Sequence, residues 1–156
     1  MGKRMSMGIV LWCMLATVAL AQEVKVLYDL RSGDKDAIHK QLINTVKVLH
    51  TYYKKNHKKL DVKVVISGKA YKYFIDDIAA TRYKYDEALI KAQDRLKPRL
   101  EMLAEIYGVK FEMCVLGMTI QEIEKKNLYP YVEAEAMRSI YLIDAQNEGY
   151  AYLPLH

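Results

Sequence analysis

Apolar and polar positions along the chain form two kinds of pattern, and the first is typical of β-strands. Residues 24–30 alternate and begin with valines, while residues 61–67 become almost continuously apolar toward their end, as in a strand covered on both faces. Residues 109–114 repeat the strand pattern. A short return at 128–135 and the segment 150–153 are weaker candidates. The sequence therefore predicts up to five strands.

Between these segments the apolar period becomes helical. A stripe starting near Asp36 continues to Tyr53, with Asp34 or Asp36 as its N-cap. In a long helix over 86–107, Pro98 is expected to kink or split the helix. Three shorter helices are predicted at 70–78, 119–127 and 136–147.

The helix at 119–127 has an apparent start signal. Thr119 is followed three residues later by Glu122, the spacing of a capping box. We therefore expect Thr119 to be the N-cap of this helix.

Alternation of strands and helices predicts an α/β fold with a mostly parallel sheet and helices on both faces. In such sheets, ligands and reactive groups gather at the carboxyl ends of the strands. Three loops, at 31–36, 67–71 and 114–119, follow the predicted strands. We expect them to meet at one edge.

The N-terminus has the three parts of a secretory signal. Lys3 and Arg4 precede an apolar stretch at 9–20, which is too short to span a bilayer, and Ala19 and Ala21 supply the small residues of a cleavage site. We predict that residues 1–21 are removed, that 22–156 form a single domain, and that the protein is secreted to the periplasm without a membrane anchor.

Cleavage would change both the charge and the thiol content. Loss of Lys3 and Arg4 lowers the formal net charge from +5 to +3, so the mature chain is only mildly basic and nucleic acid is not an expected partner. Of the two cysteines, Cys13 would be lost and Cys114 retained. An internal disulfide is then excluded, which leaves a reactive thiol, an intermolecular bridge or a buried inert residue.

Cys114 is the main candidate for chemistry. It ends a predicted strand and precedes a predicted helix, and the amides at a helix start lower the pKa of a thiol. Gly117 would permit close approach of the backbone. The alternative is that Cys114 is a small buried hydrophobic residue.

Other sites are less well supported. The four histidines lack the spacing of a helical zinc site, and no second cysteine remains after cleavage, so no metal is expected. No GxGxxG or complete phosphate loop is present, and no cofactor is predicted. Lysines between 47 and 72 could form a docking surface for an acidic partner or an anion, or simply a solvated helix end.

The ordered set "KVLYDLRSGD", "VKVVISGKAYKYF", "YGVKFEMCVLGM" and "LIDAQNEGYAYLPL" resembles the DsrE/DsrF-like family of sulfur-relay proteins, specifically its secreted members. The resemblance covers essentially the whole of 22–156. It implies a compact three-layer fold with a mostly parallel five-stranded sheet, and homo-oligomers, often trimers or hexamers.

The resemblance also implies a function. Cys114 matches the cysteine that in sulfur-transferring relatives accepts a persulfide sulfur and passes it to another carrier, so a sulfur-donor or acceptor protein is an expected partner. Many relatives carry His-Gly after the second strand, where this chain has Ser67-Gly68. The candidate site is therefore Cys114 with a pocket of Ser67, Gly68, Gly117, Met118 and Thr119. The alternative is a non-catalytic homo-oligomeric module that binds a small anion or a protein.

Overall fold

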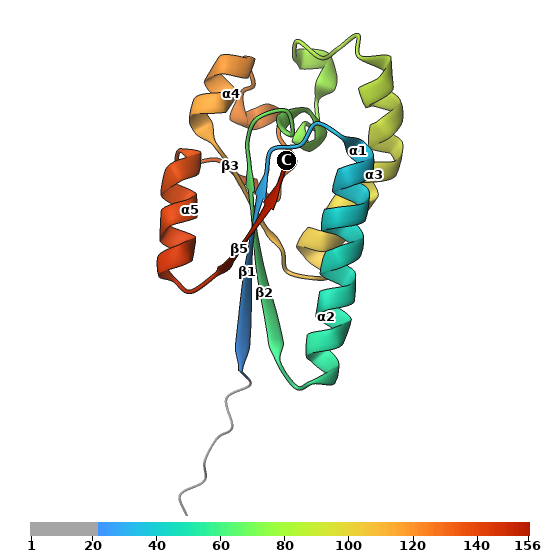
Figure 1. Cartoon of the computed structure of the whole chain (residues 1–156). Coiled ribbons are helices and arrows are strands. Elements are labelled where there is room, and N and C mark those ends of the chain that lie inside the picture. The colour runs from blue at the N-terminus through green and yellow to red at the C-terminus, as the bar shows by residue number, and fades with distance from the viewer. Residues whose placement is uncertain (1–21) are drawn as a thin grey trace, which may run out of the picture.

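The computed structural model describes residues 22–156, and the predicted signal sequence, residues 1–21, lies outside them. A five-stranded sheet forms the centre, with the strand order β4-β3-β2-β1-β5 and every pair parallel. Figure 1 shows the sheet between two layers of helices. The predicted three-layer α/β fold is confirmed.

The strands and helices follow one another in this order: β1 (Glu23–Leu30), α1 (Lys35–Ala37), η1 (Ile38–Asn44), α2 (Thr45–Lys55), β2 (Lys59–Ile66), η2 (Tyr71–Phe74), η3 (Ile78–Ala80), α3 (Glu87–Glu105), β3 (Lys110–Met113), α4 (Val115–Gln121), η4 (Lys125–Asn127), β4 (Val132–Glu133), α5 (Arg138–Asn147) and β5 (Ala151–Leu155). All five predicted strands are present, and β4 has only two residues. No helix within 22–156 is long and apolar enough to cross a membrane.

One face of the sheet holds the larger core. Alternate strand residues such as Val26, Val64 and Phe111 pack there with the apolar stripes of η1, α2 and α3. Pro98 lies inside α3, which is one continuous helix, so the split that the sequence allowed does not occur. Leu89, Leu96 and Leu103 of that helix are buried, and their burial against the sheet outweighs the hydrogen bond that proline cannot donate.

The first helix follows the prediction except in its middle. Asp34 is its N-cap, and the Asp34 carboxylate accepts a hydrogen bond from the amide of Asp36. From Ile38 to Asn44 the backbone forms a π-helix, in which the neighbours Leu42 and Ile43 are both buried. A wider turn lets two successive apolar side chains face the core, which a regular α-period does not predict.

The predicted helix at 70–78 is wrong. Two short 3₁₀ turns, η2 and η3, replace it, and Ile75 between them is extended and forms an isolated antiparallel bridge with Leu128. The amide of Asp76 donates to the Asn127 carbonyl at 2.7 Å. Pairing with this distant segment satisfies backbone groups that a continuous helix would have bonded internally.

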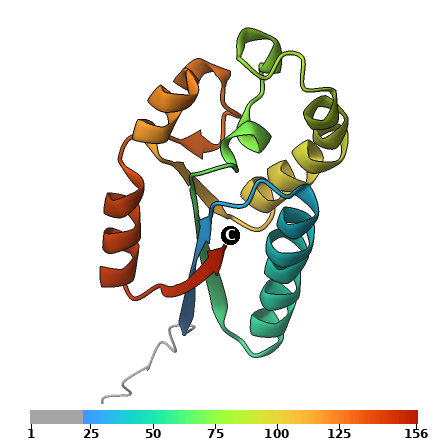
Figure 2. The ribbon, with the colours of Figure 1, turned by 45° about the horizontal axis from the view of Figure 1, so that its top comes forward.

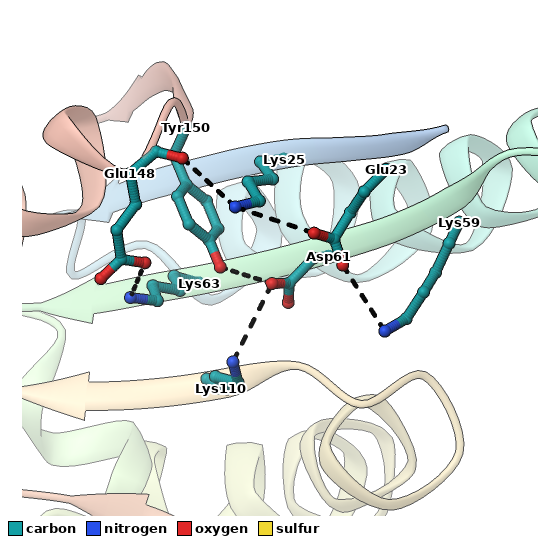
Figure 3. Close-up of polar contacts among 8 residues, drawn as sticks. All are labelled: Glu23, Lys25, Lys59, Asp61, Lys63, Lys110, Glu148 and Tyr150. Atoms are coloured by element: carbon teal, nitrogen blue, oxygen red, sulfur yellow. Dashed lines mark hydrogen bonds and ion pairs between the residues drawn. The ribbon is translucent and has the colours of Figure 1, made fainter. Parts of the chain in front are cut away.

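α5 covers the other face of the sheet. Leu27 and Val65 point to that side and pack with Tyr141, Leu142 and Ala145 in a smaller core. On this face the part of the sheet near the amino ends of the strands is polar. Lys63 donates to Glu148 at 2.9 Å, and Tyr150 donates to Asp61 (Figure 3). The Nζ of Lys63 also lies 4.9 Å from the centroid of the Tyr150 ring.

Candidate functional site

The ends of β2 and β3 bring two predicted site residues together. Ile66 and Met113 are register partners, and the amide of Cys114 continues the ladder by donating to the Ile66 carbonyl at 3.1 Å. Ser67 and Cys114 are therefore neighbours at the carboxyl edge of the sheet. The strand–helix alternation predicted that the loops after these strands would meet at this edge.

Cys114 itself begins α4. Its backbone is extended (φ −66°, ψ 115°), and its carbonyl accepts from the amide of Met118 at 3.2 Å. Cys114 is thus the N-cap residue of a helix that starts at Val115. The strand passes into the helix through the thiol-bearing residue, with no intervening loop.

The prediction of a helix over 119–127 capped by Thr119 is wrong. Thr119 lies inside α4, where its hydroxyl donates to the Val115 carbonyl at 3.2 Å, and Glu122 is left-handed with φ 56° and ends the helix. A capping box does exist, but it is formed by Glu124 and Asn127 at the 3₁₀ turn η4. The Thr119–Glu122 spacing matched by coincidence.

Three backbone amides and the Tyr71 hydroxyl lie around the Cys114 sulfur. The amides belong to Leu116 and Gly117, at the start of α4, and to Arg138, at the start of α5, while the Tyr71 hydroxyl donates its proton to the Cys114 carbonyl. Burial raises the pKa of the Cys114 thiol, but these hydrogen bonds outweigh burial, and the pKa lies below its ordinary value. The N-cap residue of α5, Met137, makes no side-chain capping bond.

Tyr71 and Gly117 pack so closely that only glycine fits. A Cβ on Gly117 would lie 1.8 Å from the Tyr71 hydroxyl oxygen and 2.3 Å from the ring carbon that carries it. The same hydroxyl donates to the Cys114 carbonyl at 3.0 Å, and Tyr71 is buried. The close approach predicted at Gly117 is therefore an approach to an aromatic ring, and it holds Tyr71 beside the thiol.

Ser67 is buried, with only 5% of its surface exposed, and its hydroxyl oxygen has no hydrogen-bond partner among residues 22–156. Met118 is also buried and belongs to the larger core, as Cys114 does. Ser67 thus lies across the β2–β3 ladder from Cys114, and Met118 and Gly117 follow it in α4.

Gly68 and Thr119 lie elsewhere. Gly68 is left-handed (φ 62°) and lines a separate hollow with Arg31, Lys69 and His156, at the ends of β1, β2 and β5. The amide of Lys69 donates to the Arg31 carbonyl at 3.0 Å, which holds the two loops together. Thr119 is exposed on α4. The predicted pocket is therefore divided between two places.

A buried ion pair beside the thiol was not predicted. Asp29, next to the carboxyl end of β1, is fully buried, and both of its carboxylate oxygens accept from the Arg138 guanidinium, one from Nε at 2.9 Å. Tyr152 donates to the same carboxylate at 2.7 Å. Burial raises the pKa of Asp29, but the bonds from Arg138 and Tyr152 bring it below its usual value. An aspartate inside an apolar strand was the available signal.

The arrangement can hold a thiolate, or a related sulfur anion, at Cys114, of whose surface 7% is exposed. Three backbone amides stabilise negative charge on the sulfur. Within the described part of the chain, no three His, Cys, Asp or Glu residues are grouped to bind a metal ion.

Comparison with known proteins identifies relatives of the whole chain. The profile of the DsrE/DsrF-like family matches residues 15–155. An uncharacterized protein of Aquifex aeolicus (strain VF5) is 26% identical in an alignment of 151 residues that covers 92% of this chain and 61% of that protein, so the chain spans about three-fifths of the relative's length.

A solved structure shares the fold. MTH1491 from Methanobacterium thermoautotrophicum, described as a protein of unknown function, superposes with a TM-score of 0.63 at 16% identity, covering 85% of this chain and 98% of its own. Because the family model matches residues 15–155, the chain belongs to the DsrE/DsrF-like family.

Proposed function

We propose that this protein carries sulfane sulfur as a persulfide on Cys114. Membership of the DsrE/DsrF-like family supports a sulfur-relay role in general. The observation that carries the specific proposal is the place of Cys114 as the N-cap residue of α4, where the amides of Leu116, Gly117 and Arg138 lower the pKa of its thiol. These donors favour the thiolate, which is the nucleophilic form of cysteine.

The chemistry is the transfer of one sulfur atom from a donor persulfide to the Cys114 thiolate. The Cys114 thiolate attacks the outer sulfur of a donor persulfide, a new sulfur–sulfur bond forms on Cys114, and the donor's own sulfur leaves as a thiolate. Attack by an acceptor thiolate on the outer sulfur of Cys114 reverses the step. No net oxidation occurs, so the protein acts as a carrier and needs no redox cofactor.

The geometry suits a bound sulfur that is protected from water. The added sulfur lies about 2 Å beyond the original one. The negative charge of the persulfide would remain close to the amides of Gly117 and Arg138, which already lower the pKa of the Cys114 thiol. Burial limits reaction with water and small oxidants, while a protein partner could reach the outer sulfur at the carboxyl edge.

We place this exchange in the periplasm because residues 1–21 resemble a cleavable secretory signal. Sequencing the N-terminus of protein recovered from a periplasmic fraction tests this part. A start at Gln22 is expected; recovery of the uncleaved chain from the cytoplasm would contradict it.

Intact-mass measurement tests the carrier role. After incubation with a low-molecular-weight persulfide and removal of the excess, one added sulfur (about 32 Da) is expected on the wild type and none on Cys114→Ser. Reduction with dithiothreitol should restore the original mass. Absence of the added mass, or equal loading of the serine variant, would refute the proposal.

A second candidate is a homo-oligomeric binding module, and one observation favours it. Apolar side chains of α4 and α5 are exposed beside the thiol, and the two helices lie next to each other in Figures 1 and 2. The most exposed are Leu116, Ile120, Met137, Ile140 and Ile143. Exposed apolar side chains gathered on two neighbouring helices are typical of a protein contact. The two candidates are compatible, because an oligomer could shield the carrier site.

A further inference from the structure

A basic groove lies between the start of the first helix and α3, away from Cys114. Lys91, Arg95 and Arg99 of α3 line one wall, and Lys35 and His39 contribute from α1 and η1. The groove has a volume of about 640 Å³, within the range of small-molecule sites. Its floor is formed by the short or apolar side chains of Ala88, Ala92 and Leu96.

The cations of this groove are not neutralised by the protein. Within residues 22–156, Lys91, Arg95 and Arg99 make no ion pair and no side-chain hydrogen bond. The one carboxylate of the lining, Asp36, is bonded to Lys35 at 3.1 Å. The groove therefore has a positive field over an uncharged floor.

The spacing of the three α3 cations costs stability. They lie four residues apart in succession, so their side chains share one helix face, and like charges at this spacing repel. Burial lowers the pKa of His39, and the charge of Arg99 lowers it further, which is consistent with a positive field at that position. A bound anion would relieve this repulsion.

We propose that this groove binds a small organic anion with two or more phosphate or carboxylate groups. Successive cations on α3 are about 6 Å apart along the helix axis, which suits anionic groups separated by a short carbon body. Arginine can hold such groups with two parallel hydrogen bonds. The carbon body would rest on Ala88, Ala92 and Leu96. The proposal does not depend on the sulfur chemistry of Cys114.

Calorimetric titration of the intact protein in low-salt buffer tests it. Fructose 1,6-bisphosphate probes the phosphate class, citrate probes the carboxylate class, and inorganic phosphate serves as the comparison with a single anionic group. Saturable binding of one ligand per chain is expected for at least one of the first two. Inorganic phosphate should bind at least about tenfold more weakly, because it engages fewer cations.

Three variants make the test specific. R95Q/R99Q should weaken binding about tenfold or more, while Lys55→Gln, an exposed lysine of α2 outside the groove, should leave affinity unchanged. Cys114→Ser should bind as the wild type does, so failure of the carrier proposal would not affect the result. The double variant should also melt no lower than the wild type without ligand, because it removes like-charge repulsion.

Three results would overturn the proposal. They are no saturable binding of either multivalent probe, equal loss of affinity in Lys55→Gln and in R95Q/R99Q, and tighter binding of a twelve-residue oligothymidylate than of both small probes. The last result would assign the groove to a nucleic-acid strand.

Discussion

The guanidinium of Arg138 donates hydrogen bonds to both carboxylate oxygens of the fully buried Asp29. A hydrogen bond from the backbone amide of the same arginine lowers the pKa of the Cys114 thiol. One residue therefore joins a buried charge near the carboxyl end of β1 to the thiol after β3. The ion pair holds the Arg138 side chain at the start of α5, and the amide of Arg138 is one of the groups that stabilise the thiolate.

Asp29→Asn should raise the pKa of the Cys114 thiol. The amide cannot form the same charged pair, so the start of α5 is held less firmly and its donor bond to sulfur weakens. The pH dependence of thiolate absorbance, or of alkylation rate, measures the shift. A loss of about 2 kcal/mol of stability is expected at the same time.

Loss of stability alone would not support this link. Asp94→Asn, an exposed position on α3, is the control, and its thiol pKa should be unchanged. An Asp29→Asn variant that is destabilised but keeps the wild-type thiol pKa would show that the ion pair is purely structural.

Gly117→Ala should disturb the site through Tyr71. The new methyl group would overlap the phenol, and the ring or the start of α4 must move, at a cost of about 1–3 kcal/mol. Urea unfolding measures that cost. In the double variant Gly117→Ala/Tyr71→Ala the clash is absent, so the two effects should be strongly non-additive. Additive costs would mean that the ring does not meet the methyl group.

Ser67→Ala tests whether the unpartnered hydroxyl has a role at the thiol. If the hydroxyl serves only structure, its removal should leave the protein as stable or up to about 1 kcal/mol more stable, because a buried polar atom without a partner is costly. We expect sulfur loading of Cys114 to fall in this variant. Unchanged loading would remove Ser67 from the site.

Glu112 should make stability depend on pH. Burial raises the pKa of its carboxyl; Lys63 and Lys110 lower it, while Glu133 and Glu148 raise it further. Because the folded pKa exceeds the unfolded one, the native state binds the proton more tightly. The resulting stability is complete below the ordinary glutamate range and is lost as the pH rises through the folded pKa.

Glu112→Gln removes this titration. Urea unfolding between pH 4 and about pH 8 should show that the wild type loses this contribution with rising pH and that the variant does not. At neutral pH the variant should be at least as stable, because no buried charge remains. The same slope in both proteins would assign the pH dependence to another group.

Ile143→Glu tests the exposed apolar surface of α4 and α5. This side chain is 56% exposed in the single chain, so a charge there should not affect folding, but it should break an interface that buries the surface. Light scattering coupled to size exclusion measures the mass. A wild-type oligomer and a monomeric variant with an unchanged melting profile at low concentration are expected; monomers in both cases would count against the oligomer.

The strand pattern predicted the architecture well. Residues 24–30, 61–67 and 109–114 lie within one or two residues of β1, β2 and β3, and the helical stripes correspond to η1, α2, α3 and α5. Period and strand–helix alternation are local properties, and parallel pairing follows from them. The same logic placed Cys114 at the carboxyl edge. Local signals failed in two segments. At 70–78 the chain pairs with a distant segment in place of forming a helix, and at 119–127 a chance capping spacing suggested the wrong helix start.

Local sequence patterns were enough to predict that one thiol follows the third strand, that glycine stands three residues later, and that the fold is α/β. The surroundings of that thiol depend on tertiary packing. Tyr71, Arg138 and Asp29 come from distant parts of the chain, and their contacts with Cys114 or with one another depend on how helices pack across the sheet. A hydrogen bond to sulfur requires positions accurate to a fraction of an ångström, and local periodicity contains no such information.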